Sequence, residues 1–238
     1  MIPLRDNVPS ATVPIVNYAL IALNLGAFAY EISLPPRALE HFLLHESLVP
    51  VKFFYGLSHL PGGLGLTVLP LFVSMFLHGG WAHVLGNMLY LYIFGDNVED
   101  RMGHARYLAF YLLVGCAAAA AQLVASPRSA VPMVGASGAI AGVMGAYFVL
   151  HPRARVLTLI PIFFFIQFVE VPAIFFLFFW FAMQFLSGTL ALATVPGEAA
   201  GGVAWWAHIG GFAAGVLLVG FFRRSRRRPP ASGGYFEA

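Results

Sequence analysis

Long runs of apolar residues, separated by charged residues or by proline and glycine, dominate the chain. A helix that crosses a bilayer needs about 20 mostly apolar residues, and six runs approach that length. They predict an all-α, polytopic membrane protein with a bundle of six transmembrane helices. We expect one membrane domain over residues 1–222 and a basic tail over 223–238. The predicted spans lie at roughly 13–33, 78–96, 105–124, 136–151, 170–190 and 203–222.

Two segments between these runs have a different pattern. In residues 34–77, apolar residues alternate with charges too closely for a span, which predicts a first outer loop of short amphipathic helices. Residues 156–169 are nearly all apolar, but 14 residues with Pro161 among them are short for a crossing. We therefore expect 156–169 not to form a seventh span.

Composition supports the membrane assignment, and charge orients it. Hydrophobic residues make up 60% of the chain and charged residues 10%, whereas a soluble domain carries about 25% charged residues. With six spans, ten arginines lie on the side of both termini and three basic residues on the other. Lys and Arg are in excess on the cytoplasmic side, so we expect a multi-pass protein of the cell (inner) membrane with both termini in the cytoplasm.

The five arginines of the tail follow the last apolar run directly, which favours an anchor on membrane lipids over binding of nucleic acid. Cys116 is the single cysteine, which excludes a disulfide framework and a multi-cysteine metal site. Arg5 and Asp6 precede the first run without a recognisable cleavage site, so we expect the first span to be retained.

Three polar clusters lie at one predicted depth. Ser137 and His208 each lie fifteen residues before the cytoplasmic end of their spans, and a rise of about 1.5 Å per residue places both about 22 Å from that boundary. His83 lies thirteen residues before Asp96, which gives about 20 Å. In a hydrocarbon layer about 30 Å thick, all three lie several ångströms below the outer surface.

Ser137 is the candidate nucleophile. It stands in Gly135-Ala136-Ser137-Gly138, where short side chains allow a neighbouring helix to approach closely. It also opens a helix, whose unpaired backbone N–H groups favour the negative charge of an oxyanion. The alternative is a helix-packing motif in which the serine hydroxyl bonds to a carbonyl one turn back.

His208 is the candidate general base. Gly211 and Gly215 follow it on one helix face, as Gly138 and Gly142 follow Ser137, and contact between two glycine faces would bring imidazole and hydroxyl together. A buried neutral histidine suits a base at neutral pH. The alternative is a core histidine bonded to a backbone group.

His83 and Asn87 are four residues apart and therefore share a helix face. Both carry donors that could point at an oxyanion, although the same residues also commonly form hydrogen bonds between helices. We expect His78, just before them, to lie in an interfacial turn with Gly79 and Gly80.

At these residues the chain resembles the rhomboid family of intramembrane serine proteases, over most of its length from about His78 to Gly215. The resemblance implies a Ser137–His208 dyad that cuts a peptide bond of a transmembrane protein substrate, without metal or cofactor. It also implies an oxyanion hole of His83, Asn87 and the Ser137 backbone N–H. The matching motifs are His83-x-x-x-Asn87, Gly135-Ala136-Ser137-Gly138 and Ala207-His208-x-x-Gly211-x-x-x-Gly215.

Two further segments match the family, and two positions depart from it. Glu99 and Arg101 resemble a structural pattern at the end of the second span, which would fix the following loop to the third span. Residues 187–202 would correspond to a flexible cap over the site. The first outer loop lacks the Trp-Arg pair of many members, and Ala141 stands where an aromatic ring often stacks on the histidine.

Two other functions compete with proteolysis. One is a catalytically inactive rhomboid-like protein that binds transmembrane clients, although such relatives usually lose the serine or the histidine. The other is a small transporter with His78, His83 and His208 as metal ligands, since three imidazoles suit zinc. We expect no acidic side chain near that layer, and we expect Glu170 at the cytoplasmic edge of the fifth span.

Overall fold

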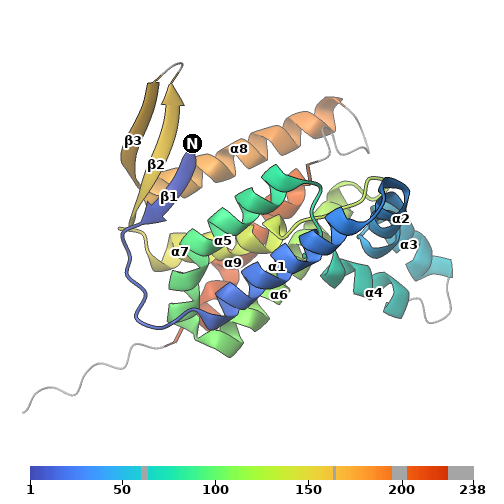
Figure 1. Ribbon diagram of the computed structural model, residues 1–238, viewed down its shortest axis with the longest axis horizontal. Helices are drawn as coiled ribbons and strands as arrows, with labels where there is room; N and C mark the ends of the chain where they lie inside the picture. Colours follow the sequence, from blue (N-terminus) through green and yellow to red (C-terminus); the bar gives the residue numbers. More distant parts are fainter. Residues whose placement is uncertain (60–63, 163–164, 195–202, 225–238) are drawn as a thin grey trace, which may run out of the picture.

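A bundle of helices makes up most of the molecule, and a small sheet lies at one end of it (Figure 1). The computed structural model describes residues 1–59, 64–162, 165–194 and 203–224. The strands are β1 (Ile2–Asp6), β2 (Arg155–Ile162) and β3 (Phe165–Pro172). The helices are α1 (Ile15–Ser33), α2 (Pro36–Glu46), α3 (Pro50–His59), α4 (Leu64–Val73), α5 (Trp81–Met102), α6 (His104–Ala125), α7 (Ser137–Leu150), α8 (Ala173–Thr194) and α9 (Trp205–Phe222).

Four of these helices are long and apolar enough to cross a membrane: α1, α6, α9 and the Ala173–Ala191 part of α8. Helix α7 is apolar but has only 14 residues. Helix α5 begins at Trp81, later than the predicted residue 78, and continues past residue 96 to Met102 with several charged residues in its last two turns. A count of six spans therefore stays a prediction, whereas a multi-pass helical bundle is present.

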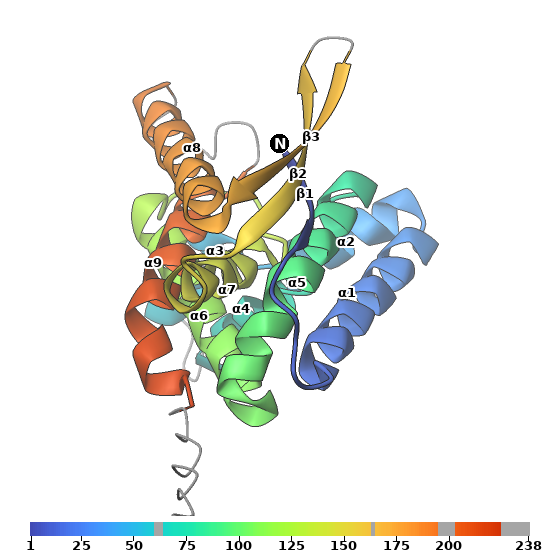
Figure 2. The same ribbon diagram turned by 90° about the vertical axis from the view of Figure 1, so that its left-hand side faces the viewer.

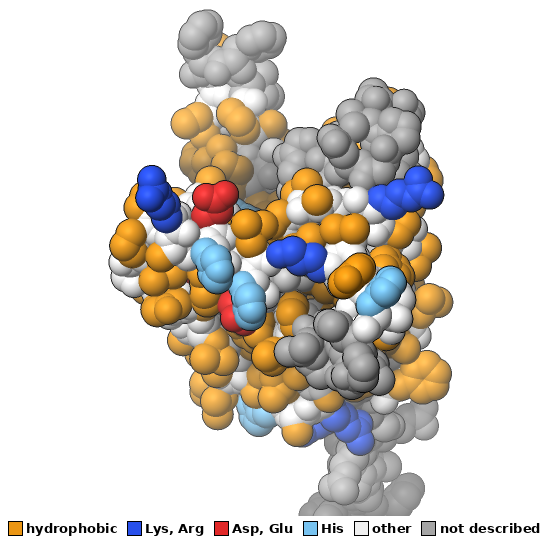
Figure 3. Space-filling view, turned by 90° about the vertical axis from the view of Figure 1, so that its right-hand side faces the viewer, with side chains coloured by type: hydrophobic (Ala, Val, Ile, Leu, Met, Phe, Trp, Pro, Cys, Tyr) orange, Lys and Arg blue, Asp and Glu red, His pale blue; other side chains and the backbone are white. Residues whose placement is uncertain are grey.

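The predicted first outer loop, residues 34–77, contains the short helices α2, α3 and α4 within its described part. Figure 3 shows this end of the molecule, where basic, acidic and histidine side chains stand among hydrophobic ones. Arg37, His41 and Lys52 are exposed there. Mixed surfaces of this kind are typical of amphipathic helices that meet water on one face.

The all-α prediction was wrong for residues 156–169, which belong to an antiparallel hairpin of β2 and β3. The sheet order is β1-β2-β3, so the N-terminal strand covers one edge of β2. Alternating β-branched residues such as Val156, Thr158 and Ile160 favour strand over helix. Pro161 lies past Leu159, the last residue of β2 that pairs with β1, and a strand tolerates proline at such an edge.

The hairpin also corrects the predicted start of the fifth span. Glu170 lies in β3 and is exposed, with its carboxylate 4.0 Å from Arg155 Nη1. Helix α8 begins only at Ala173, directly after the strand. Glu170 is therefore a residue of the sheet and not of a membrane-spanning helix.

Helices α7 and α9 pack backbone against backbone, which confirms the prediction that two glycine faces meet. A Cβ atom added to Gly211 would lie 2.1 Å from the Gly138 carbonyl oxygen, and one added to Gly215 would lie 2.0 Å from that of Gly142. On the other side of the contact, a Cβ at Gly145 would lie 2.2 Å from the Phe212 carbonyl oxygen. The two helices can reach this separation only without side chains between them.

Glu99 joins three helices at the end of the bundle where the sheet lies. Its buried carboxylate accepts hydrogen bonds from the backbone N–H groups of Val16, at 3.0 Å, and Asn17, at 2.7 Å, and it also contacts His104 Nδ1. A carboxylate at the N-terminus of α1 satisfies N–H groups that have no partner within the helix. The expected link from α5 to α6 is present, and a link to α1 accompanies it.

Asp6 at the end of β1 joins the sheet to the bundle. Its carboxylate accepts hydrogen bonds from the Tyr147 hydroxyl of α7 and from Asn97 Nδ2 of α5, the latter at 2.9 Å. Burial raises the pKa of Asp6 to about 6, and the nearby Asp96 carboxylate adds to the rise.

We predict that Gly215→Ala lowers the free energy of unfolding by roughly 1–3 kcal/mol, because a methyl group there meets the Gly142 backbone and forces α7 and α9 apart. Gly220→Ala is the matched control on the same helix, since no described atom lies within 4 Å of its added Cβ. Thermal unfolding in detergent measures both variants. Equal melting temperatures for the two variants would contradict the close packing.

A second prediction concerns pH. The unfolded chain has an Asp pKa of about 3.9, so the folded protein binds more protons at Asp6 than the unfolded chain does. The contribution of protonated Asp6 to the free energy of unfolding is fully present below about pH 4 and is lost as pH rises through about 6. Asp6→Asn, which cannot ionise, should reduce the fall in melting temperature between about pH 4 and about pH 7. An identical fall in wild type and variant would contradict this assignment.

Candidate active site

Ser137 is the first residue of α7, and the chain before it is held in place by the first outer loop. The backbone N–H of Met133 donates to the Leu48 carbonyl at 2.8 Å, and that of Gly135 donates to the Ser74 carbonyl at 2.9 Å. These bonds fix the direction in which the chain enters α7. The serine hydroxyl is therefore positioned by backbone contacts as well as by its own helix.

Gly135 has a φ of +127°, a conformation that residues with a side chain rarely adopt. A Cβ atom there would lie 2.7 Å from His83 Nε2. Glycine at this position thus allows both the turn into α7 and the close approach of the His83 ring to the backbone just before Ser137.

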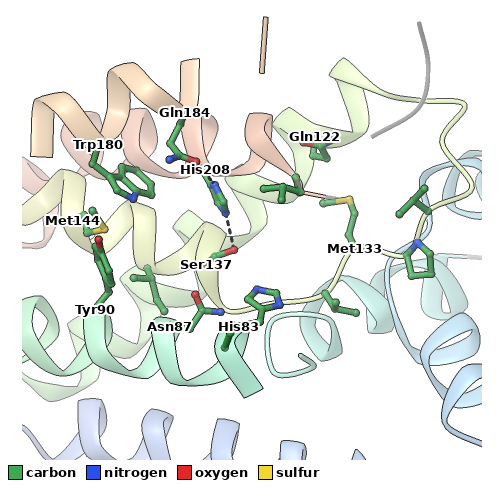
Figure 4. A pocket seen from close by; sticks show the side chains of 18 of the residues that line it. His83, Asn87, Tyr90, Gln122, Met133, Ser137, Met144, Trp180, Gln184 and His208 are labelled. Carbon is green, nitrogen blue, oxygen red and sulfur yellow. Dashed lines mark hydrogen bonds between the residues drawn. The ribbon is translucent and has the colours of Figure 1, made fainter. Parts of the chain in front are cut away.

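His208 lies in the first turns of α9 and makes hydrogen bonds with both ring nitrogens. Its Nε2 lies 2.8 Å from Ser137 Oγ, and its Nδ1 lies 2.8 Å from Gln184 Oε1 of α8 (Figure 4). The hydroxyl and the imidazole that the sequence places at equal depth are thus within hydrogen-bonding distance. The contact with Gln184 was not predicted.

Aromatic side chains surround the imidazole from α8 and α9. The ring centroid of Trp180 lies 5.8 Å from that of His208, and the Trp205 ring lies perpendicular to His208 at 6.3 Å. Ala141 is fully buried in the core. The rings that lie close to His208 are therefore those of Trp180 and Trp205, whereas position 141 offers only a methyl group.

His83 and Asn87 project from α5 beneath Ser137 (Figure 4). His83 Nδ1 accepts a hydrogen bond from the Gly79 backbone N–H at 3.4 Å. Asn87 Nδ2 donates to His78 Nε2 at 3.0 Å. The amide group of Asn87 is thus oriented by a second histidine, which the sequence analysis expected in an interfacial turn.

His78 is 2% exposed and lies against an acidic side chain. Its backbone N–H donates to both carboxylate oxygens of Glu31, at 3.1 and 3.2 Å, and Glu31 is 1% exposed. The expectation that no acidic residue lies near this layer was therefore wrong. Glu31 stands within the first apolar run, where a lone acid in a transmembrane segment is itself a signal of a specific contact.

Gln122 near the end of α6 positions the start of α9. Its Oε1 accepts hydrogen bonds from the backbone N–H groups of Trp206, at 3.1 Å, and Ala207, at 3.2 Å. It thereby accepts from donors in the first turn of α9, where the Ala207 N–H also donates to the Ala204 carbonyl at 3.0 Å. Gln122 and Gln184 were both missed, although each is an amide within an otherwise apolar stretch.

One cavity of about 390 Å³ lies between α5, α8 and the segment before α7. Of the residues described above, it is lined by His83, Asn87, Gln122, Ser137, Trp180, Gln184 and His208. It is bounded by Tyr90 and Asn87 on one side and by Trp180 and Gln184 on the other (Figure 4). The hydroxyl of Ser137 is at its wall, so a peptide in the cavity could reach it.

The first half of the predicted cap, residues 187–202, is helical and not a flexible loop. Residues 187–194 continue helix α8, and residues 195–202 lie outside the described part of the chain. Of the three histidines considered as metal ligands, His208 has hydrogen-bond partners at both ring nitrogens. Within the described residues, no three His, Cys, Asp or Glu side chains come together as a possible metal site.

The Rhomboid domain family matches residues 66–225, which is more than half of the chain and includes most of the cavity wall. The chain belongs to the rhomboid family. This assignment and the apolar helices identify it as a multi-pass membrane protein with the fold of a rhomboid-type hydrolase.

Three relatives show how far the similarity extends. The mitochondrial Rhomboid protein 1 of Saccharomyces cerevisiae is 27% identical over 92% of this chain and 58% of its own length. The Rhomboid protease GluP of Bacillus subtilis is 42% identical over 32% of this chain and 14% of its own length. The chloroplastic Rhomboid-like protein 11 of Arabidopsis thaliana is 41% identical over 29% of this chain and 24% of its own length. The chain thus spans less than two thirds of each of these proteins.

Proposed function

We propose that this rhomboid protein is an intramembrane serine endopeptidase that cleaves transmembrane protein substrates. The observation that carries the proposal is the 2.8 Å separation of Ser137 Oγ and His208 Nε2 at the wall of a cavity. A hydroxyl is a weak nucleophile until a base takes its proton. A histidine in hydrogen-bonding contact with it supplies that base.

The reaction that follows is acyl transfer. His208 Nε2 accepts the Ser137 proton as Oγ attacks the carbonyl carbon of the substrate. The C–N bond then breaks, and the imidazolium returns the proton to the leaving amine. A water molecule, deprotonated by His208, attacks the acyl ester in the second half and releases the carboxylic acid product, which restores the serine hydroxyl.

The oxyanion of each tetrahedral intermediate needs donors on the opposite side of the carbonyl from His208. The Ser137 backbone N–H is free of intrahelical bonding because it is at the start of α7. His83 and Asn87 are proposed as the side-chain donors, supported by their place in the cavity lining below Ser137 (Figure 4). The Asn87 amide carries two N–H donors, so one can stay on His78 Nε2 while the other points at the oxyanion.

The chemistry restricts the substrate. A transmembrane helix buries its carbonyl groups in its own hydrogen bonds, so the segment must unwind before Ser137 can attack. We therefore propose substrates with small or helix-breaking residues near the cleaved bond. No metal or cofactor enters any step of this mechanism.

We also propose that the membrane is the cell (inner) membrane and that both termini face the cytoplasm. Arginines gather at the end of the bundle opposite the cavity, close to where α5, α7 and α9 end. The positive-inside rule places such an end in the cytoplasm. The described residues that support this orientation are Arg5, Arg101, Arg106, Arg153, Arg155, Arg223 and Arg224.

A catalytically inactive protein that binds transmembrane clients is the alternative function. It would need the cavity but not the serine–histidine contact. The presence of both residues in hydrogen-bonding distance favours the enzyme.

We predict that Ser137→Ala and His208→Ala each abolish cleavage of a panel of transmembrane segments by protein reconstituted in liposomes. His83→Ala or Asn87→Ala should reduce cleavage by about 10²–10³-fold, the usual cost of losing an oxyanion donor. Cys116→Ser serves as the control variant, because Cys116 is not part of the cavity lining.

Thermal unfolding in detergent checks that each variant is folded. Full cleavage by Ser137→Ala would end the proposal, and so would cleavage that stops when a chelator is added to the wild type. A wild type that binds the same segments but does not cleave them would favour the client-binding alternative.

A further inference from the structure

Gln184 contacts the imidazole on the side away from the serine. Gln184 Oε1 lies 2.8 Å from His208 Nδ1, while Ser137 Oγ lies 2.8 Å from Nε2. Gln184 is 9% exposed, so water competes little for its amide oxygen. One ring therefore bridges an amide on α8 and a hydroxyl on α7 (Figure 4).

This contact determines where the imidazole carries its hydrogen. An amide oxygen only accepts hydrogen bonds, so Nδ1 must be the protonated nitrogen. Neutral imidazole has one N–H, which leaves Nε2 with a lone pair that faces the Ser137 hydroxyl. The other tautomer would direct an N–H at the hydroxyl oxygen and could not take its proton.

We propose that Gln184 is a positioning residue that holds His208 in the tautomer and orientation needed by the base. The inference rests on the proposed function, because it names the group that replaces the carboxylate of a Ser-His-Asp triad. The amide contributes orientation without a negative charge, in a layer where a buried charge is costly.

The packing of α8 against α9 supports this role. Trp180 and Gln184 are four residues apart on α8 and share a face, as His208 and Phe212 do on α9. Trp180 lies 5.8 Å from the His208 ring and 6.3 Å from the Phe212 ring. The orientation of the imidazole therefore depends on how α8 is seated against α9.

The test compares Gln184→Met, which keeps the length of the side chain but cannot accept at that atom, with Gln184→Glu, which keeps an acceptor oxygen. We expect Gln184→Met to lower kcat about 10- to 100-fold with little change in KM, because the base loses its alignment. We expect Gln184→Glu to recover most of the activity. Met183→Ala, on the exposed side of the same helix, is the control.

Nitrogen-15 NMR of histidine-labelled protein adds a measurement that does not require activity. The His208 signals, identified by their loss in His208→Asn, should show a protonated Nδ1 in the wild type and lose that preference in Gln184→Met. Unchanged kcat and unchanged tautomer in Gln184→Met would overturn the inference. A wild type that cleaves nothing but shows the Gln184-dependent tautomer would instead overturn the proposed function.

A different surface carries a second inference: the β2–β3 hairpin is apolar on both faces. Phe165, Ile166 and Phe168 are 71%, 61% and 63% exposed. Successive side chains of a strand point to opposite faces, so Phe165 lies on one face and the other two on the opposite face. Neither face of the hairpin can be turned fully to water without exposing a large ring.

The hairpin extends past the side of the bundle at the end where α8 begins, and its strands cross the direction of α8 (Figures 1 and 2). This end is opposite the cavity, because α7 starts at Ser137 in the cavity and its last residue lies five positions before β2. The strands therefore run across the helix direction at one end of the bundle and do not continue the bundle axis.

Two features restrict how deep the hairpin can lie. Within the described part of the chain, the outer edge of β3 has no neighbouring strand, and unpaired backbone N–H and C=O groups are not tolerated in hydrocarbon. Arg153 and Arg155, just before and at the start of β2, are exposed. The Glu170 carboxylate lies 4.0 Å from Arg155, so the three side chains together carry one net positive charge, which attracts anionic headgroups. The apolar faces need acyl chains, whereas the edge and the arginines need headgroups or water.

We infer that the hairpin lies in the interfacial layer of one leaflet and that lipid covers both of its faces. A protein partner seated on one face would leave the opposite face exposed, whereas acyl chains reach both. Anionic lipid is the favoured headgroup class because of the arginines at the base of the hairpin.

A fluorophore on Phe168→Cys, in a Cys116→Ser background, tests this in vesicles of anionic and zwitterionic lipid. We expect stronger quenching by a nitroxide near the headgroup than by one near the chain end. The order should reverse for Leu217→Cys, which replaces a side chain that is 74% exposed on α9. No quenching at position 168 would overturn the inference, and so would efficient disulfide formation between two copies of the unlabelled Phe168→Cys variant.

Discussion

The direct contact of two glycine faces is the constraint on which the rest of this structure depends. Van der Waals packing and hydrogen bonds hold membrane helices together, because lipid chains are as apolar as the protein interior and the hydrophobic effect therefore does little to drive helix association. Gly138 and Gly142 on α7 meet Gly211 and Gly215 on α9 with no side chain between them. Ser137 and His208 lie at the first turns of these two helices, so the distance between hydroxyl and imidazole is a consequence of the backbone contact.

Buried polar groups then fix the ends of the helices that this contact brings together. Glu99 satisfies the N-terminus of α1, Gln122 that of α9, and Glu31 the backbone just before α5. Each of these side chains accepts a hydrogen bond from a backbone N–H group that lipid could not satisfy. The polar residues of this apolar chain are therefore few, and many of them have a specific backbone partner.

The parts of the site that follow from short-range rules were predictable, and those that depend on distant partners were not. A count of residues from the cytoplasmic end of each span, converted with the helical rise, placed Ser137 and His208 at one depth from residue numbers alone. Gln184 could not be assigned to His208 in this way, because its contact depends on the rotation of α8 and on where that helix begins. That start was placed three residues too early, because residues 170–172 pair with β2 as the end of β3, a contact with a segment that short-range rules do not reveal.

The choice of an amide beside the imidazole has a physical reason in the location of the site. A carboxylate there would have to be desolvated together with the histidine, and the cost of a buried charge often exceeds its Coulombic gain. An amide oxygen avoids that cost and still selects the tautomer, because it accepts a hydrogen bond and donates none. A triad in water gains both orientation and charge stabilisation from its acid. Beneath a membrane surface the two contributions separate, and Gln184 supplies the one that does not require a buried ion.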